Sequence, residues 1–356
     1  MSQGRLEALL RRCKVYFKTH QHYLKISAIF LSFAIPFILL YNLHPQSFNE
    51  TWKGRTFYVF FLWLIMLEIV LSWDEFKSRT PDKLKPMREG LLGIALLIPT
   101  LYVVFANYFG LNTAIIDIST QWGVTWTSWM PLAVEYLAFT ISFVVIALFA
   151  YGFNGVKFFS ISAFFLGLVG MIYLVDNFYP HGQFTPFQIL VPTTASFAAN
   201  FLNILGYQTS FGAPREGMPL LTARNEVGHQ SYLIAWPCSG VQSLLIYTVV
   251  MFLFLKKINI HFVQKAVYFA FGAVVTYFIN ILRIASIFII AINYGKSAAV
   301  VFHNYYGELY SMVWIIAYPL LIIGSRMLWL KLNSYLAGGL KERFAHRPAL
   351  QNSAHG

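Results

Sequence analysis

Eight long apolar stretches constrain the fold of this chain more than any other feature of its sequence. They lie at about residues 23–43, 56–73, 90–110, 131–151, 157–176, 240–255, 262–282 and 304–330. A helix needs about 20 apolar residues to cross roughly 30 Å of hydrocarbon, and most of these stretches approach or exceed that length. Charged residues make up 11% of the chain, against about 25% in soluble domains. We therefore expect an all-α polytopic membrane protein with about eight transmembrane helices.

The positions of the lysine and arginine residues predict how the chain is oriented. With the N-terminus inside the cell, 20 of the 26 basic residues fall in segments on the cytoplasmic side. An even number of spans puts both termini there, so we expect a multi-pass protein of the cell membrane with N-in, C-in topology. The net charge of +12 comes from short basic clusters between apolar stretches, which is typical of topology signals rather than of a nucleic-acid partner.

The sequence predicts one membrane domain with two basic cytoplasmic ends. Residues 1–22 form a basic arm, 23–330 the single membrane domain, and 331–356 a cytoplasmic tail. No internal repeat or low-complexity linker indicates a second domain. The loop at 111–130 is expected outside and is rich in tryptophan, which favours an aromatic belt at the membrane interface over a wall that faces the substrate.

The largest segment outside the membrane is expected to be an extracytoplasmic insertion at 177–237. Its apolar stretch 187–207 is interrupted by Thr, Ser and Asn residues. We therefore expect an amphipathic or re-entrant helix on the outer surface rather than a ninth span, with Gly206 as its stop signal. Turn signals within 208–235 predict a small strand-and-loop element that leads into Cys238.

Cys238 is the first candidate catalytic residue. It precedes Ser239 and Gly240 at the expected N-terminal end of a membrane helix. Most isolated membrane cysteines are simply small apolar residues, but the unpaired N–H groups and the helix dipole at this position favour a thiolate and could form part of an oxyanion hole. Gly240 is expected to let a substrate carbonyl approach. The only other cysteine, Cys13, lies in the cytoplasmic arm, and no CxxC occurs, so we expect neither a disulfide nor a thiolate metal site.

Two further polar residues lie in apolar surroundings near the same predicted face. Arg283 follows Asn280 by three residues, so both project from one helix face, and an arginine there must find a partner, face water or snorkel. His303 opens the last apolar stretch. It is either an interfacial side chain or the base that makes a thiolate of Cys238. Glu308, five residues further on, is a candidate to orient His303.

The order of these residues resembles the exosortase/archaeosortase family of membrane-embedded cysteine transpeptidases. The family pattern is Cys-Ser-Gly at the start of a membrane helix, Asn-x-x-Arg in the next helix and a His that opens the last one. The sequence has Cys238-Ser239-Gly240, Asn280 with Arg283, and His303 in that order. The resemblance covers about residues 185–330.

The resemblance implies a reaction and its partners. Cys238 would cleave the C-terminal sorting signal of an exported surface protein and hold the product as a thioester, with His303 as base and then acid. Arg283 would stabilise the developing charge, and Asn280 and Ser239-Gly240 would support the site. Substrates would carry a short motif, a transmembrane helix and a basic tail. A lipid-linked acceptor would resolve the thioester at the extracytoplasmic face, and no cofactor is implied.

Two other functions stay open at this point. A membrane acyltransferase would use His303 and Asn304 and would need no cysteine. A non-enzymatic transporter would line its path with intramembrane polar groups such as Arg283, although the polar residues here cluster at the outer boundary. His181 and His229 are alternative imidazoles in the extracytoplasmic insertion.

Overall fold

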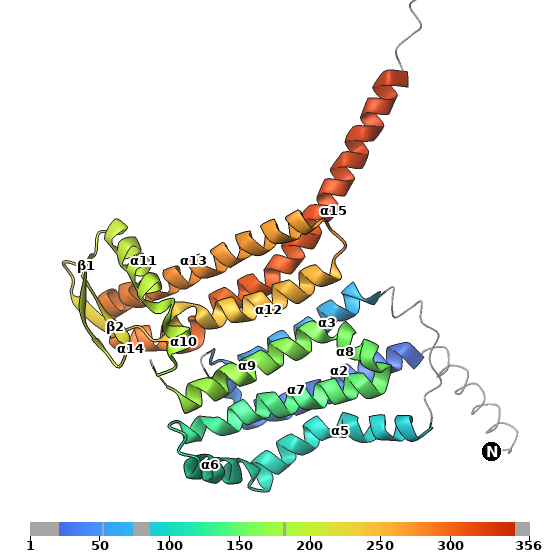
Figure 1. The fold of residues 1–356 in the computed structure, drawn as a ribbon, viewed down its shortest axis with the longest axis horizontal. Helices are drawn as coiled ribbons and strands as arrows, with labels where there is room; N and C mark the ends of the chain where they lie inside the picture. The colour runs from blue at the N-terminus through green and yellow to red at the C-terminus, as the bar shows by residue number, and fades with distance from the viewer. Residues whose placement is uncertain (1–20, 52, 74–85, 181–182, 346–356) are drawn as a thin grey trace, which may run out of the picture.

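The protein is a bundle of long helices with a small sheet at one end (Figure 1). The computed structural model describes residues 21–51, 53–73, 86–180 and 183–345. One long helix falls on each of the eight predicted apolar stretches. These are α2 (Gln21–Leu43), α3 (Thr56–Leu71), α5 (Pro86–Tyr108), α7 (Met130–Tyr151), α9 (Ser160–Phe178), α12 (Val241–Lys257), α13 (Phe262–Tyr294) and α15 (Leu309–Ala345).

Six helical stretches of the described chain are long and apolar enough to span a membrane, so this is a multi-pass membrane protein. They are Leu24–Leu43, Met87–Tyr108, Thr127–Tyr151, Ser160–Phe178, Phe262–Tyr294 and Lys296–Trp329. The apolar helix α3 has only 16 residues, and α12, which ends in two lysines, has 17. The prediction of a helical membrane protein is confirmed, whereas the count of eight spans and the N-in, C-in topology stay predictions.

The predicted end of one span, at residue 282, is wrong, whereas the predicted end of the last span at 330 agrees with the apolar stretch Lys296–Trp329. α13 continues to Tyr294 instead of ending at 282, because the apolar residues resume after Arg283 and the arginine is held inside the protein. α15 runs to Ala345, so the first part of the predicted tail prolongs this helix (Figure 1). Most of the predicted basic arm, including Cys13, lies outside the described residues.

The predicted outer loop at 111–130 contains a helix. α6 spans Leu111–Gln121, and a 3-10 turn, η2, spans Thr127–Trp129. The ring of Trp126 lies 3.7 Å from Nζ of Lys53, so this tryptophan makes a cation–π contact within the protein. The aromatic belt therefore does not account for every tryptophan of this segment.

The insertion before Cys238 has the predicted helix and strands. After the short α10 (Thr185–Gln188), α11 (Val191–Ile204) packs against α13 and the sheet, and Gly206 follows it with φ +89°. The sheet is antiparallel with the order β1-β2-β3. Its strands are β1 (Gln208–Arg215), β2 (Met218–Arg224) and β3 (His229–Leu233).

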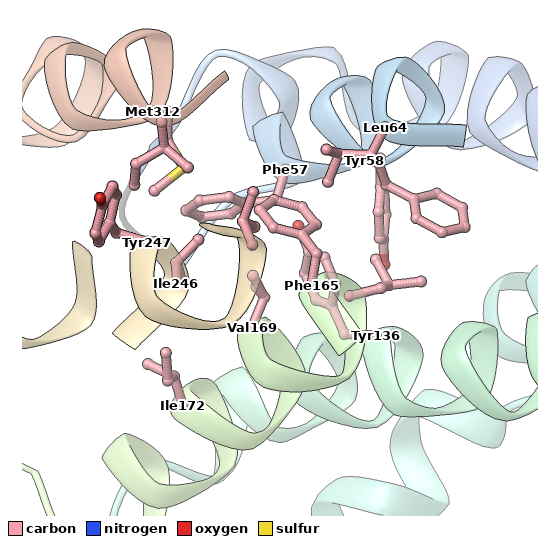
Figure 2. Close-up of a cluster of buried hydrophobic side chains, with 14 of the residues drawn as sticks. Phe57, Tyr58, Leu64, Tyr136, Phe165, Val169, Ile172, Ile246, Tyr247 and Met312 are labelled. Atoms are coloured by element: carbon pink, nitrogen blue, oxygen red, sulfur yellow. The ribbon is translucent and has the colours of Figure 1, made fainter. Parts of the chain in front are cut away.

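One apolar core joins the helices that precede the insertion to those that follow it. Figure 2 shows buried side chains of α3, α7 and α9 packed against Ile246 and Tyr247 of α12 and Met312 of α15. Phe57 of α3 and Phe165 of α9 are each 1% exposed. The two parts of the chain therefore share their interior, and α12 is fixed relative to α9 and α3 before any polar contact is considered.

Two buried carboxylates anchor this bundle. Glu68 of α3 accepts hydrogen bonds from the N–H groups of Ile161 and Ser162 at the start of α9 and from Nζ of Lys257 at the end of α12. Glu135 of α7 accepts two hydrogen bonds, of 2.7 and 2.8 Å, from the guanidinium of Arg55. A buried charge is tolerated only when it is paired and hydrogen-bonded. Both carboxylates meet this condition, so their role is to hold the helices together.

Candidate active site

Cys238 lies in a single 3-10 turn, η3 (Trp236–Ser239), between β3 and α12. Gly240 then adopts φ +89°, a left-handed conformation that glycine tolerates, and α12 begins at the next residue. A Cβ atom at Gly240 would lie 2.8–2.9 Å from side-chain atoms of Asn280 on α13. Backbone conformation and close packing therefore both require glycine at position 240, and the expected access of a substrate carbonyl stays a prediction.

The thiol of Cys238 faces the imidazole of His303. Its Sγ lies 3.2 Å from Nε2, and Nδ1 of the same ring lies 3.1 Å from Oδ1 of Asn304. His303 is part of η4 (Phe302–Tyr306), a π-helical turn between α14 (Lys296–Val301) and α15. Such turns are rare and often occur at functional sites. The two side chains predicted to act together are thus in contact, although 65 residues separate them.

The surroundings of Cys238 favour its ionised form. Burial alone would raise the pKa of the thiol. The charge of His303, its hydrogen bond to the thiol and the charge of Arg283 outweigh burial and the opposing charge of Glu308, so the pKa of Cys238 is lowered from its usual value. Because the thiolate is the nucleophilic form, this arrangement increases the reactivity of the cysteine.

Arg283 projects from the interior of α13 and is 2% exposed, which excludes the snorkelling interpretation. Its Nη2 lies 3.6 Å from Oε1 of Glu308, and none of its three guanidinium nitrogens makes a hydrogen bond within the described residues. A Cβ atom at Gly307 would lie 2.8 Å from Nε, so the guanidinium passes directly beside the turn that carries His303. Buried donors without partners cost free energy, so the unbonded guanidinium needs a physical account beyond packing.

Glu308 is placed differently from the prediction that it orients His303. Its Oε2 accepts a hydrogen bond of 2.8 Å from Nε2 of Gln242 on α12, and its Oε1 faces Arg283. The side chain in contact with Nδ1 of His303 belongs to Asn304. Glu308 therefore orients the arginine of the site.

Asn280 and Ser239 hold backbone and helices in place. Oδ1 of Asn280 accepts hydrogen bonds from Ser243 on α12, at 3.2 Å, and from Ser311 on α15, at 3.3 Å. Oγ of Ser239 donates to the carbonyl oxygen of Trp236 at 2.8 Å and so closes the turn around the thiol. Both residues are 0% exposed, so they support the site from the interior of the protein.

A cavity of about 210 Å³ opens at Cys238 and His303. The end of β3, one face of α13 and the start of the last helical segment surround it, and most of its walls are apolar. The other lining residues are Tyr232, Leu233, Ile234, Ile284, Ile287, Phe288, Ala299, Val300 and Asn304. Such walls favour an apolar group over a charged one.

The site also contains a contact that the sequence did not indicate. The N–H and Oγ1 of Thr51, in the loop between α2 and α3, donate to the carbonyl oxygen of Asn304 at 2.8 and 3.0 Å. In the same loop, Nζ of Lys53 lies 3.0 Å from Asp176 and 2.7 Å from Asn177 of α9. Burial lowers the pKa of Lys53 to about 8 against the opposing effect of Asp176. The loop is thus fixed to α9 and holds the turn that carries His303.

Of the two alternative imidazoles, the one that the structure describes does not line the cavity. His229 is exposed on β3, and His181 lies outside the described residues. Within the described part of the chain, no group of three or more His, Cys, Asp or Glu residues could hold a metal ion.

Comparison with known protein families gives one match, to the family described as transmembrane exosortase, over residues 51–321. That range is about three quarters of the chain and contains every residue of the site, from Thr51 to Glu308. The chain belongs to the transmembrane exosortase family. The resemblance inferred from residues 185–330 is therefore confirmed, and the exosortase region begins far earlier, at the loop that holds Asn304. Searches of curated proteins and of solved structures gave no match.

Proposed function

We propose that this exosortase-family protein is a cysteine peptidase and transpeptidase that cleaves C-terminal sorting signals from exported surface proteins. The observation that carries the proposal is the 3.2 Å contact between Sγ of Cys238 and Nε2 of His303. It supplies a nucleophile and a proton acceptor in one cavity. A nucleophile within hydrogen-bond reach of a base is the arrangement that covalent acyl transfer needs.

The reaction proceeds in two acyl transfers. The Cys238 thiolate attacks the scissile carbonyl, the C–N bond breaks, and protonated His303 gives its proton to the departing amine. The acyl group is then a thioester on Cys238. In the second step His303 removes a proton from an acceptor nucleophile, which attacks the thioester carbonyl and releases the Cys238 sulfur. A lipid-linked acceptor gives transpeptidation, and water gives hydrolysis.

Arg283 is the electrostatic group of this mechanism. The tetrahedral intermediate carries a negative oxygen, and hydrogen-bond donors held in place for such an oxygen stabilise it strongly. The buried guanidinium has unused donors beside the His303 turn, and Glu308 keeps it oriented at 3.6 Å. The amide of Cys238 is a poorer candidate, because it already donates to the carbonyl oxygen of Ala235 at 3.0 Å.

The substrates are membrane-bound precursors with a short motif, one transmembrane helix and a basic cytoplasmic tail. Such a precursor presents its motif at the extracytoplasmic surface, where the proposed N-in, C-in topology puts the sheet, η3 and η4. This orientation rests on the distribution of basic residues along the sequence.

The test uses a tagged host protein that ends in an apolar span and a basic tail, expressed together with this protein. Cys238→Ala is expected to abolish processing, because no other side chain replaces the thiolate, whereas Cys13→Ala processes normally. Immunoblotting measures precursor, product and the level of the protein itself. Normal processing by Cys238→Ala overturns the proposal and favours the acyltransferase that uses His303 and Asn304.

A further inference from the structure

The sheet has a free edge that leads directly to Cys238. Within the described residues, β3 pairs with β2 on one side and with no strand on the other. Only Ile234 and Ala235 separate Leu233 from Trp236, the first residue of the turn with the thiol. Tyr232, Leu233 and Ile234 line the cavity that contains Cys238 and His303. The strand edge and the reacting atoms are therefore parts of one continuous surface.

The register shows which backbone groups of β3 face outward. In an antiparallel pair, residues alternate between those bonded to the neighbouring strand and those directed away from it. Ile234 N–H donates to Pro219 O at 3.0 Å, and Asn225 N–H donates to Gly228 O at 2.9 Å. Because hydrogen-bonded residues recur at every second position, Ile234, Tyr232 and Gln230 are the residues that bond to β2. The N–H and C=O groups of His229, Ser231 and Leu233 are directed to the free edge.

We propose that the free edge of β3 binds the substrate motif as an added β-strand and delivers its scissile carbonyl to Cys238. This inference rests on the proposed peptidase function and specifies how its substrate is held. The occupant is the extended segment just before the cleavage site of a precursor protein. Backbone hydrogen bonds to Ser231 and Leu233 supply affinity with little dependence on the substrate's sequence, as in other proteins that bind a peptide as an added strand.

The cavity beside the edge supplies the selectivity. Ile284, Ile287 and Phe288 of α13 and Val300 of α14 form its apolar walls. Side chains of an added strand point alternately to its two faces, so one substrate side chain enters these walls while its neighbours face outward. The motif therefore contains one apolar residue near the cleavage site, flanked by residues that are less restricted.

Proline at an outward-facing position tests the strand directly. Ser231→Pro removes an N–H group that the β2 ladder does not use, so the sheet is retained. The matched control is Phe211→Pro, the corresponding outward-facing position on β1 at the far edge, where the neighbouring outward residue Thr209 already donates its N–H to Asn203 at 3.2 Å. Processing of the tagged precursor by Ser231→Pro is expected to fall about tenfold, while Phe211→Pro processes normally.

A thiol measurement separates loss of docking from loss of the site. In a Cys13→Ser background, iodoacetamide is expected to modify Cys238 of Ser231→Pro at the rate of the parent protein. Normal processing by Ser231→Pro overturns strand addition but leaves the peptidase function intact. Continued processing by Cys238→Ala would instead remove the function on which the inference rests.

Disulfide trapping decides the case if Ser231→Pro loses both processing and thiol reactivity. Ser231→Cys and Phe211→Cys are each placed in a chain that lacks Cys13 and Cys238. Single cysteines are then scanned through the six residues before the cleavage site of the precursor. A disulfide with position 231 and none with position 211 supports strand addition; trapping at 211, or at neither position, overturns it.

Discussion

The Cys238 thiol lies in an environment that contains opposing influences on its ionisation. Burial and the carboxylate of Glu308 disfavour the thiolate, whereas His303 and Arg283 favour it and prevail. Removal of one positive partner should therefore return the pKa of the thiol toward, or above, its ordinary value. No such effect is expected from a cysteine that only fills space in the core.

The pH dependence of alkylation measures this balance. In a Cys13→Ser protein, the rate of modification by iodoacetamide follows the thiolate fraction, so its midpoint is expected below the ordinary thiol pKa of about 8.5. His303→Gln removes the charge and the hydrogen bond to Sγ, and the midpoint moves to higher pH. Arg283→Gln also moves the midpoint to higher pH, but by less than His303→Gln does. Identical midpoints in all three proteins contradict the proposed activation.

At the scale of single elements, η4 and the loop before α3 form one unit. The π-helical turn carries His303, and its neighbour Asn304 contacts the ring through its side chain and Thr51 through its carbonyl oxygen. The position of the imidazole therefore depends on a loop 253 residues earlier in the chain. Thr51 is a positioning residue, since it acts on His303 through Asn304.

Thr51→Val tests this connection. The substitution keeps the shape and the N–H donor but removes the Oγ1 bond of 3.0 Å, which is worth about 1 kcal/mol. Processing is expected to slow several-fold, and the alkylation midpoint of Cys238 to rise as the imidazole loosens. Thr51→Ser, which keeps the hydroxyl, restores both. An unchanged midpoint in Thr51→Val would show that the loop contributes only stability.

These elements also show which parts of the site a sequence can predict. Cys238, Arg283 and His303 were found because each is a polar or reactive residue at the border of, or inside, an apolar stretch. His303 is the predicted partner of the thiol because an imidazole is the usual base for a cysteine nucleophile, and the contact at 3.2 Å agrees with this prediction. Gln242 gave a similar signal, since it is a polar residue in an apolar helix, but its contact with Glu308 depends on how α12 and α15 pack.

Other features could not be predicted, because they depend on tertiary packing. Thr51 is an ordinary loop residue, and nothing near it in the chain indicates Asn304. The sequence predicts the end of this span near 282, whereas α13 continues to Tyr294, because Glu308 and the bundle interior accommodate Arg283. The close contact of Gly240 with Asn280 belongs to the same class, because it is visible only in three dimensions.

At the scale of the whole molecule, the helices before and after the insertion are joined at both ends. Near the site, Thr51 holds the carbonyl of Asn304. Where α12 ends, Lys257 donates to Glu68, whose carboxylate is 0% exposed. Between them runs the shared apolar core of Figure 2. The C-terminal helices therefore carry the reacting groups but depend on the N-terminal helices for their geometry.

Lys257→Met tests the second connection. It leaves the buried Glu68 carboxylate without its cation, and breaking such a pair costs about 3–5 kcal/mol. Thermal unfolding in detergent is expected at a clearly lower temperature. Lys256→Met, one residue earlier and exposed, serves as the control and should change little. Glu68→Gln combined with Lys257→Met should recover part of the loss; equal effects of the two lysine substitutions contradict the assignment.

The predicted topology is tested in intact cells. In a chain without Cys13 and Cys238, Phe211→Cys on β1 is expected to react with a membrane-impermeant maleimide, because the predicted N-in, C-in topology puts the sheet outside. Lys256→Cys, at the opposite end of α12, should react only after the membrane is permeabilised. The reverse labelling pattern would invert the orientation and move the proposed site to the cytoplasmic side.

The distance along the chain between Cys238 and His303 has a consequence during biosynthesis. The ribosome adds roughly 5–20 residues per second, so His303, which follows Cys238 by 65 positions, is made about 3–13 s later. During that interval the sulfur lacks the neighbour that contributes most to its ionisation. The pairing that favours the thiolate therefore forms only after the last helical segment has been made and has packed beside Cys238.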